Sequence, residues 1–345
     1  MKAMSLGRSA QRLGGGRVRI AAGCAAAVLL LAGCSAFGGS SASDSSPAGA
    51  SITIAAVPGV GDAPLYVAWR QGLFQQHGLT VHLRSYQTMR QVMDALGSGQ
   101  ADVAVGDYAD FFYEQEVDTS APMVLLSDGY DAVPNIMDVV VSPGSRITTP
   151  RDLRGKRIGT AQPQVMPYSA TATTPYSIDT VAASSALDNN GVQPNLVKWV
   201  PMPASQLVNA LRTHRVDAIL VTEPQIFQAE SEIGARTILD ACSGQTVNLP
   251  LDGYFAPRSF AEKNRSALLA FRSVMTRAQA DAVQPAPLET VFTHYAGMNR
   301  QTAALITVGQ YPTAVKVTSL QRVADLMSFY GALIRPLAVS RMLLP

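Results

Sequence analysis

Two periods of apolar and polar positions alternate along residues 51–106. Short stretches in which every second residue is apolar, or in which all are, are typical of β-strands, whereas apolar residues at i, i+3, i+4 and i+7 are typical of α-helices. Strands are predicted at Ser51–Val57, Leu79–Tyr86 and Asp102–Gly106, and helices at Pro64–Phe74 and over Met89, Val92, Met93 and Leu96. Strands that alternate with helices predict a mostly parallel sheet.

The same order of elements recurs about a hundred residues later. Strands are predicted at Lys156–Thr160, Leu196–Val200 and Asp217–Val221, and helices at Ser177–Asn190 and over Ala204, Leu207, Val208 and Leu211. Thirteen residues separate Met89 from Asp102, and thirteen separate Ala204 from Asp217. A repeated unit of helix, turn, Asp and apolar strand predicts two lobes that are built alike.

The chain is predicted to cross between the lobes twice. The apolar run Asn135–Val141 is the first crossing, and the return lies between Thr237 and Tyr254. Helical patterns in Ser259–Leu344 are expected to pack on the first lobe. The predicted fold class is therefore α/β with two lobes, each a mostly parallel sheet flanked by helices. Lobe 1 comprises residues 51–138 and 245–345, and lobe 2 comprises residues 139–244.

The first 33 residues have the pattern of an export signal. They carry five basic and no acidic residues, and Ile20–Ala32 is uncharged. Thirteen uncharged residues are too few for a comfortable membrane span but suit the core of a signal peptide. The run ends in Leu31-Ala32-Gly33-Cys34, which resembles the bacterial lipoprotein box. This predicts lipidation of Cys34, a Ser- and Gly-rich tether over 34–50 and an extracytoplasmic, membrane-anchored protein. The alternative is a general secretory signal in which Cys34 occurs by chance.

Composition and charge exclude several other classes. Hydrophobic residues are 47% of the chain and charged residues 15%, which is typical of a folded protein. Beyond residue 33 there are 22 basic and 25 acidic residues, so the folded part has the wrong charge for binding nucleic acid. The sequence contains no zinc-protease, CxxC, serine-hydrolase or phosphate-loop motif. We therefore predict neither an enzyme, nor a cofactor, nor a metal site, and we expect Cys242 to be a buried apolar residue.

Five motifs, in order, resemble one family. They are Pro64–Ala68 with Gly72-Leu-Phe74, Leu96–Gly106, Asp152–Ile158, Arg215–Pro224 and Phe260–Asn264. The chain is similar over roughly residues 51–285 to substrate-binding proteins of ABC importers, in the class that binds nitrate, sulfonates, taurine and thiamine-pyrimidine precursors. The resemblance implies a type II periplasmic-binding-protein fold. It also implies a monomer that captures a small solute between its lobes and delivers it to a membrane permease.

Candidate solute contacts lie in loops that follow the predicted strands, because ligands of parallel sheets bind at the carboxyl ends of the strands. These candidates are Val60, Gly61, Asp62, Asp107, Tyr108, Thr160, Tyr168, Ser169, Tyr176, Ser177 and Glu223. Asp107 would accept a hydrogen bond or pair with a cation, and Tyr108 would form a stacking wall. The alternative is that Asp62 and Asp107 cap helices, and that Glu223 with Pro224 is structural.

The candidate loops offer carboxylates and hydroxyls but no cation. Members of the family that hold sulfonate or nitrate usually have a Gly-Ser or Ser-Ser step where this chain has Ala161–Ser177. A neutral or amine-bearing solute, such as a heterocycle, is therefore favoured over a simple anion. Two further functions stay open. One is a lipoprotein that binds a partner without transport, and the other, less favoured, is an enzyme of the pyrimidine-synthase-like branch of the fold.

Overall fold

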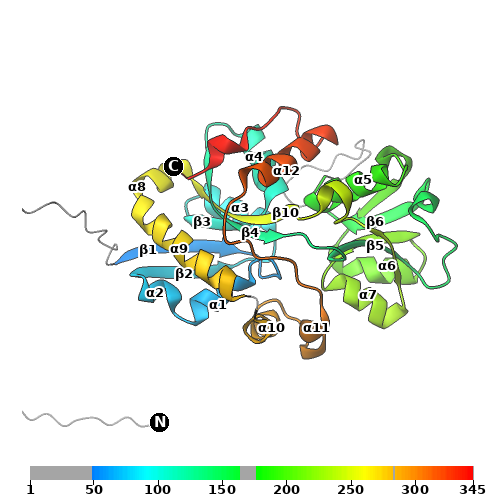
Figure 1. The fold of residues 1–345 in the computed structure, drawn as a ribbon, viewed down its shortest axis with the longest axis horizontal. Helices are drawn as coiled ribbons and strands as arrows, with labels where there is room; N and C mark the ends of the chain where they lie inside the picture. The colour runs from blue at the N-terminus through cyan, green and yellow to red at the C-terminus, as the bar shows by residue number, and fades with distance from the viewer. Residues whose placement is uncertain (1–48, 164–175, 283, 345) are drawn as a thin grey trace, which may run out of the picture. The chain divides into compact units, whose positions relative to one another are not determined.

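Ten β-strands form two separate five-stranded sheets in the computed structural model, which describes residues 49–163, 176–282 and 284–344 (Figure 1). The first sheet has the order β2-β1-β3-β10-β4, and the second has the order β7-β6-β8-β5-β9. The strands of the first sheet are β1 (Ala50–Ala56), β2 (Leu79–Ser85), β3 (Val103–Asp107), β4 (Met123–Asp131) and β10 (Pro250–Pro257). Those of the second are β5 (Met137–Val141), β6 (Arg157–Ala161), β7 (Lys198–Met202), β8 (Ala218–Thr222) and β9 (Arg236–Asp240).

Each sheet has one strand that runs against the other four. β10 is antiparallel to β3 and β4, and β5 is antiparallel to β8 and β9, whereas the remaining pairs are parallel. The predicted α/β class with two mostly parallel sheets is thus confirmed. The antiparallel strands, β5 and β10, are the first strands that the chain forms after it crosses from the other lobe. They therefore enter their sheets from the side of the crossing.

Helices cover both faces of the first sheet. Ile52 and Ile54 face a core formed with α1 (Ala63–Arg70), α2 (Leu73–Gln76) and α9 (Arg265–Asp281), in which the rings of Phe74 and Phe271 stack 5.8 Å apart. Ala55, on the opposite face, packs against α3 (Met89–Gly97) and α4 (Tyr108–Val117). Alternation along one strand therefore places apolar groups in two cores, as a doubly covered sheet requires.

The second sheet repeats this arrangement. Val140 and Ile219 pack against α6 (Leu207–Arg212) and α7 (Gln225–Ile233), while Val139 and Leu220 belong to the core that contains α5 (Ile178–Asn189). The single helix predicted over 64–74 is divided, because Gly72 adopts the left-handed conformation with φ of 67° and starts α2 anew.

The repeated aspartates occupy equivalent places in the two sheets. The carboxylate of Asp102 accepts a hydrogen bond from the N–H of Thr53 on β1, and the N–H of Asp102 donates to the carbonyl of Thr53, both at 2.8 Å. Asp217 makes the same pair of bonds with Arg157 on β6, at 2.8 and 2.9 Å. The repeated sequence pattern therefore corresponds to one supersecondary unit that occurs in both sheets.

The two crossings lie close to their predicted places. The first runs from Asp131, the end of β4, to Met137, the start of β5. Met137 and Asp138, which the sequence assigned to lobe 1, are therefore part of the second sheet, and the apolar run is a buried strand rather than the crossing itself. The return joins Asp240 to Pro250. Ala50, assigned to the tether, is the first residue of β1.

The C-terminal helices contact both lobes, whereas the prediction placed them on the first alone. They are α8 (Arg258–Lys263), α9, α10 (Pro285–His294), α11 (Arg300–Leu305) and α12 (Val317–Phe329). α9 and α10 pack on α1, but α11 contacts α7 and α12 lies against both α4 and α5. Within the described ranges, none of the helices has the length and apolarity needed to cross a membrane.

Candidate functional site

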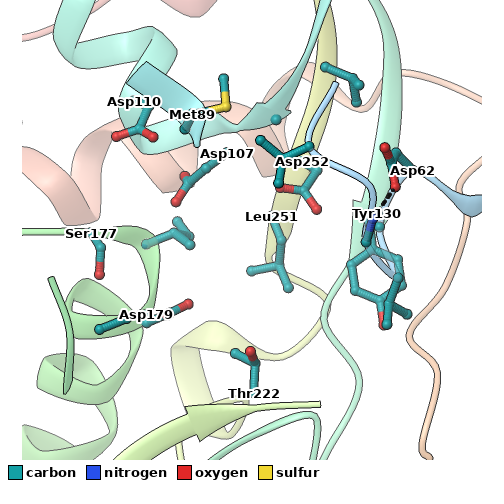
Figure 2. A pocket seen from close by; sticks show the side chains of 18 of the residues that line it. Asp62, Met89, Asp107, Asp110, Tyr130, Ser177, Asp179, Thr222, Leu251 and Asp252 are labelled. Carbon is teal, nitrogen blue, oxygen red and sulfur yellow. Dashed lines mark hydrogen bonds between the residues drawn. The ribbon is translucent and has the colours of Figure 1, made fainter. Parts of the chain in front are cut away.

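A cavity of about 390 Å³ lies where loops of the two lobes meet (Figure 2). The first lobe contributes the loops after β1, β2 and β3 together with the start of β10, and the second contributes residues after β6 and β8 and the start of α5. The parallel strands point their carboxyl ends at this cavity, which is where sheets of this kind bind ligands. Its volume suits a small molecule.

Carboxylates dominate the polar lining of the cavity. Among the described residues that line it, none is Lys, Arg or His. Six are acidic: Asp62, Asp107, Asp110, Asp179, Glu223 and Asp252. Six acidic side chains in a lining without a basic one favour a positively charged ligand over an anion. Arg90, which is not among the lining residues, acts on Asp110.

Asp107 and Asp252 form the centre of this acidic group. They are directly opposed on the antiparallel strands β3 and β10, so their side chains leave the same face of the sheet. Gly61 provides the space for Asp252, because a Cβ at position 61 would overlap the Asp252 carboxylate. Two opposed carboxylates are destabilising unless a proton or a cation lies between them.

Burial raises the pKa of every one of the six carboxyls, and neighbouring carboxyls add to the effect for most of them. The pKa of Asp62 rises to about 8, those of Asp110 and Asp252 to about 7 and that of Asp179 to about 6. The pKa of Asp107 is raised well above its usual value by burial and by the charges of its neighbours Asp110, Asp252 and Asp179. The carboxyl groups of the cavity therefore retain protons near neutral pH.

The helix N-termini at the cavity are occupied by the chain's own side chains. Asp107 Oδ1 accepts from the N–H of Ala109 in α4, and Ser177 Oγ accepts from the N–H of Thr180 in α5. Asp110 and Asp179 lie in the first turns of the same two helices. Helix N-termini are the usual anion sites of α/β proteins, so acidic side chains already occupy the places where a bound anion would lie.

Glu223 is fully engaged by backbone. Its Oε2 accepts from the N–H of Phe227 in α7 at 3.1 Å, and its Oε1 accepts from the N–H of Thr307 at 3.2 Å. Although Glu223 lines the cavity, its hydrogen bonds agree with the structural role considered for it. Asp62 occupies the N-cap position of α1, but its carboxylate accepts from Gly59 N–H at 2.8 Å and does not cap the helix.

Six predicted contacts line the cavity: Val60, Gly61, Asp62, Asp107, Ser177 and Glu223. Tyr108 and Thr160 do not. The Tyr108 side chain turns into the core, where its hydroxyl donates to Asp128 Oδ1 at 2.7 Å and its ring packs over Gly253, so it is no stacking wall. The reason is that β3 is covered on both faces, and the residue after Asp107 points inward.

Three predicted contacts come from the loop before α5. Tyr176 faces a separate depression beside Gly331 and Arg335. Tyr168 and Ser169, like Cys34 and the signal and tether residues 1–48, lie outside the described residues.

Four important lining residues were not predicted: Asp110, Tyr130, Asp179 and Asp252. Asp110 and Asp179 follow predicted contacts by three and two residues, so the first turn of each helix was a usable signal. Asp252 and Tyr130 come from β10 and β4, strands that reach the site only through sheet pairing. Local sequence gives no sign of this.

Cys242 is buried and free. Burial raises the pKa of its thiol, so it is a poor nucleophile. No group of three or more acidic, His or Cys side chains among the described residues is arranged to hold a metal ion.

Residues 61–287 match the family described as NMT1/THI5 like, and the chain belongs to that family. No significant match was found among curated protein sequences. Many solved structures have a similar fold. The periplasmic aliphatic sulphonate binding protein SsuA from Escherichia coli superposes with a TM-score of 0.68 at 16% identity, over 86% of this chain and 97% of SsuA.

The periplasmic nitrate-binding protein NrtA from Synechocystis PCC 6803 gives a TM-score of 0.62 at 13% identity, over 82% of each chain. The desulfurization enzyme DSZB also superposes with a TM-score of 0.62, at 16% identity, over 86% of this chain and 96% of DSZB. The three structures share 13–16% sequence identity with this chain. At such low identity these structures establish the fold alone, so the nature of any solute has to be inferred from the chemistry of the site.

Proposed function

We propose that this protein is a solute-binding lipoprotein, anchored through Cys34 outside the cytoplasm, that captures a small amine-bearing organic cation and delivers it to the permease of an ABC importer. The observation that carries the choice of solute is the composition of the cavity lining: of its described residues, six are acidic and none is basic. A protonated amine supplies the missing positive charge. The heterocyclic body favoured by the sequence is compatible with the apolar part of the lining.

A sulfonate or nitrate ion fits this lining poorly. It would need Lys, Arg or free helix N–H groups, and the N-termini of α4 and α5 are already capped by Asp107 and Ser177. It would also approach the opposed carboxylates of Asp107 and Asp252. The solutes named for SsuA and NrtA are therefore not the ones we propose for this chain.

A binding role is also favoured over catalysis. Ser177, the lining hydroxyl at the start of α5, serves as a helix cap and bonds to Thr180. It is thus not paired with a general base in the manner of a serine nucleophile.

The proposal is tested by a thermal-shift and calorimetry screen of the full-length protein. The panel holds aliphatic monoamines and diamines, aminomethyl-pyrimidines, taurine, alkanesulfonates and nitrate. A ligand at a hundredfold its dissociation constant adds about 2.7 kcal/mol to the unfolding free energy, which is readily measured. We expect stabilisation by one or more amines. Stabilisation by nitrate or an alkanesulfonate, with none by any amine, would overturn the choice of solute.

A further inference from the structure

We infer that the cleft selects cations that carry N–H donors, such as primary ammonium groups, over quaternary ammonium ions, and that Asp107, Asp252 and Asp179 hold the charged group jointly from both lobes. This inference rests on the proposed function and deepens it. It concerns which cation is bound and which three side chains bind it.

The three carboxylates have acceptor capacity that the protein leaves unused. Asp252 and Asp179 form no side-chain hydrogen bond within the described part of the chain, and Asp107 uses one oxygen to cap α4. Asp107, Asp252 and Asp179 line the same cavity, and Figure 2 shows the Asp107 carboxyl on the side of Ser177 and the Asp252 carboxyl on the side of Asp62. A primary ammonium group has three N–H donors and no acceptor, so it can donate to three carboxylates at once.

Two further acidic side chains surround this position and are more deeply buried. Asp110 is 9% exposed; burial is the main cause of its raised pKa, and the positive charge of Arg90 acts in the opposite direction. The Asp62 side chain, 5% exposed, has Oδ2 without a hydrogen-bond partner among the described residues. A buried acceptor without a donor is costly. A bound cation at the Asp107–Asp252 pair would stabilise both neighbours electrostatically.

The lining is unsuited to a quaternary ammonium ion. Such ions bind against the faces of several aromatic rings. Among the described lining residues, Tyr130 alone is aromatic. Its hydroxyl is fixed by the N–H of Gly309 at 2.6 Å, and its ring lies 5.3 Å from that of Tyr311. A trimethylammonium group would therefore meet carboxylates to which it cannot donate and would lack an aromatic enclosure.

The remaining lining suits an aliphatic or flat apolar body. Val60, Val105, Ile136, Ile178 and Leu251 contribute apolar side chains to the cavity. The charged group thus lies against carboxylates while the rest of the solute contacts hydrocarbon.

Asp179 extends the proposed cation site to the second lobe. It lies in the first turn of α5 in the second lobe, whereas Asp107 and Asp252 belong to the first sheet. A cation held by all three connects the lobes. Replacing Asp179 should therefore weaken binding even though the first-lobe pair is intact.

The experiment compares matched ligands and matched variants by calorimetry on the full-length protein. Each amine of the panel that binds is paired with its N,N,N-trimethyl analogue, which keeps the charge and removes the donors. We expect the amine to bind at least tenfold more tightly. Asp252→Asn and Asp179→Asn should each weaken amine binding at least tenfold and reduce its preference over the trimethyl analogue. Asp94→Asn, on the exposed face of α3 outside the cavity, is the matched control.

Gly61→Ala provides a second route if Asp252→Asn alters folding. The added methyl group would displace the Asp252 carboxylate without removing its charge, and we expect a loss of amine affinity here too. Equal affinity for amine and trimethyl analogue would overturn the inference and leave cation binding intact. Unchanged affinity in Asp179→Asn would overturn the two-lobe component. Binding of anions alone would overturn the proposed function as well.

Discussion

At the scale of single residues, the cavity is defined by carboxyl groups whose pKa values are raised. Burial is the largest cause for Asp62, Asp110, Asp179 and Asp252, and nearby carboxyls contribute to the pKa of Asp62, Asp110 and Asp252. Such groups bind protons more tightly in the folded state than in the unfolded one, in which an Asp has a pKa of about 3.9. They therefore link folding, ligand binding and pH.

The sign of the pH dependence follows from this difference. Between about pH 4 and pH 8 the folded chain holds protons that the unfolded chain has released, so the free energy of unfolding decreases as pH rises. For the ligand-free protein we expect a decrease of roughly 2 kcal/mol or more from pH 5 to pH 8, measured by denaturant titration. Asp252→Asn should show a smaller decrease. An increase in stability over this interval would contradict the raised pKa values.

At the scale of secondary-structure elements, the molecule uses one βαβ unit twice. Asp102 and Asp217 each bind the neighbouring first strand of their sheet through carboxylate and backbone N–H. Asp217 additionally pairs with the Arg157 guanidinium at 2.9 Å. The repeated aspartate therefore determines where the third strand of the unit aligns with the first.

Replacing Asp102 tests the structural role of the repeated aspartate. Asp102→Ala leaves the N–H of Thr53 without its side-chain acceptor, which should cost about 1–3 kcal/mol of unfolding free energy. The measurement is urea unfolding of the full-length protein, with Asp94→Ala on the exposed face of α3 as control. If Asp102→Ala were as stable as the control, the shared hydrogen bond would be incidental to the fold.

At the scale of the whole chain, the C-terminal segment ties the two lobes together beside the cavity. Tyr311 donates from its hydroxyl to the carbonyl of Val60 at 2.7 Å, and Gln310 and Asp131 exchange two backbone hydrogen bonds. Thr307 donates to Glu223 of the second lobe. Loops of both lobes that line the cavity are therefore held by residues that follow them far along the sequence.

Membrane attachment is a property of the whole protein that the N-terminal sequence predicts. Cys34→Ser should remove the lipid-bearing thiol and shift the protein from the membrane pellet to the soluble fraction, with loss of incorporated radiolabelled fatty acid. Cys24→Ser, which lies within the predicted signal peptide, is the control and should leave both unchanged. Continued membrane attachment and labelling of Cys34→Ser would contradict the predicted lipidation.

Local sequence pattern was enough to predict the α/β class and the strands and helices of the two βαβ units, but not β4, β9 and β10. Helical and strand periods depend on local alternation of apolar residues, and the cap at Ser177 and the stop at Gly191 depend on adjacent residues. The loops that would contain the site followed from the same pattern, because the carboxyl ends of parallel strands meet at one edge. Asp62, Asp107 and Ser177 were accessible to this reasoning.

The tertiary structure alone decided which side chains meet in the cavity. Asp252 reaches Asp107 because β10 inserts antiparallel between β3 and β4, after the chain has passed through the second lobe. Tyr108, one residue beyond Asp107, turns inward because α4 packs its first residue on the sheet. Sheet order and the direction of a single side chain depend on packing between distant segments, which no local pattern records.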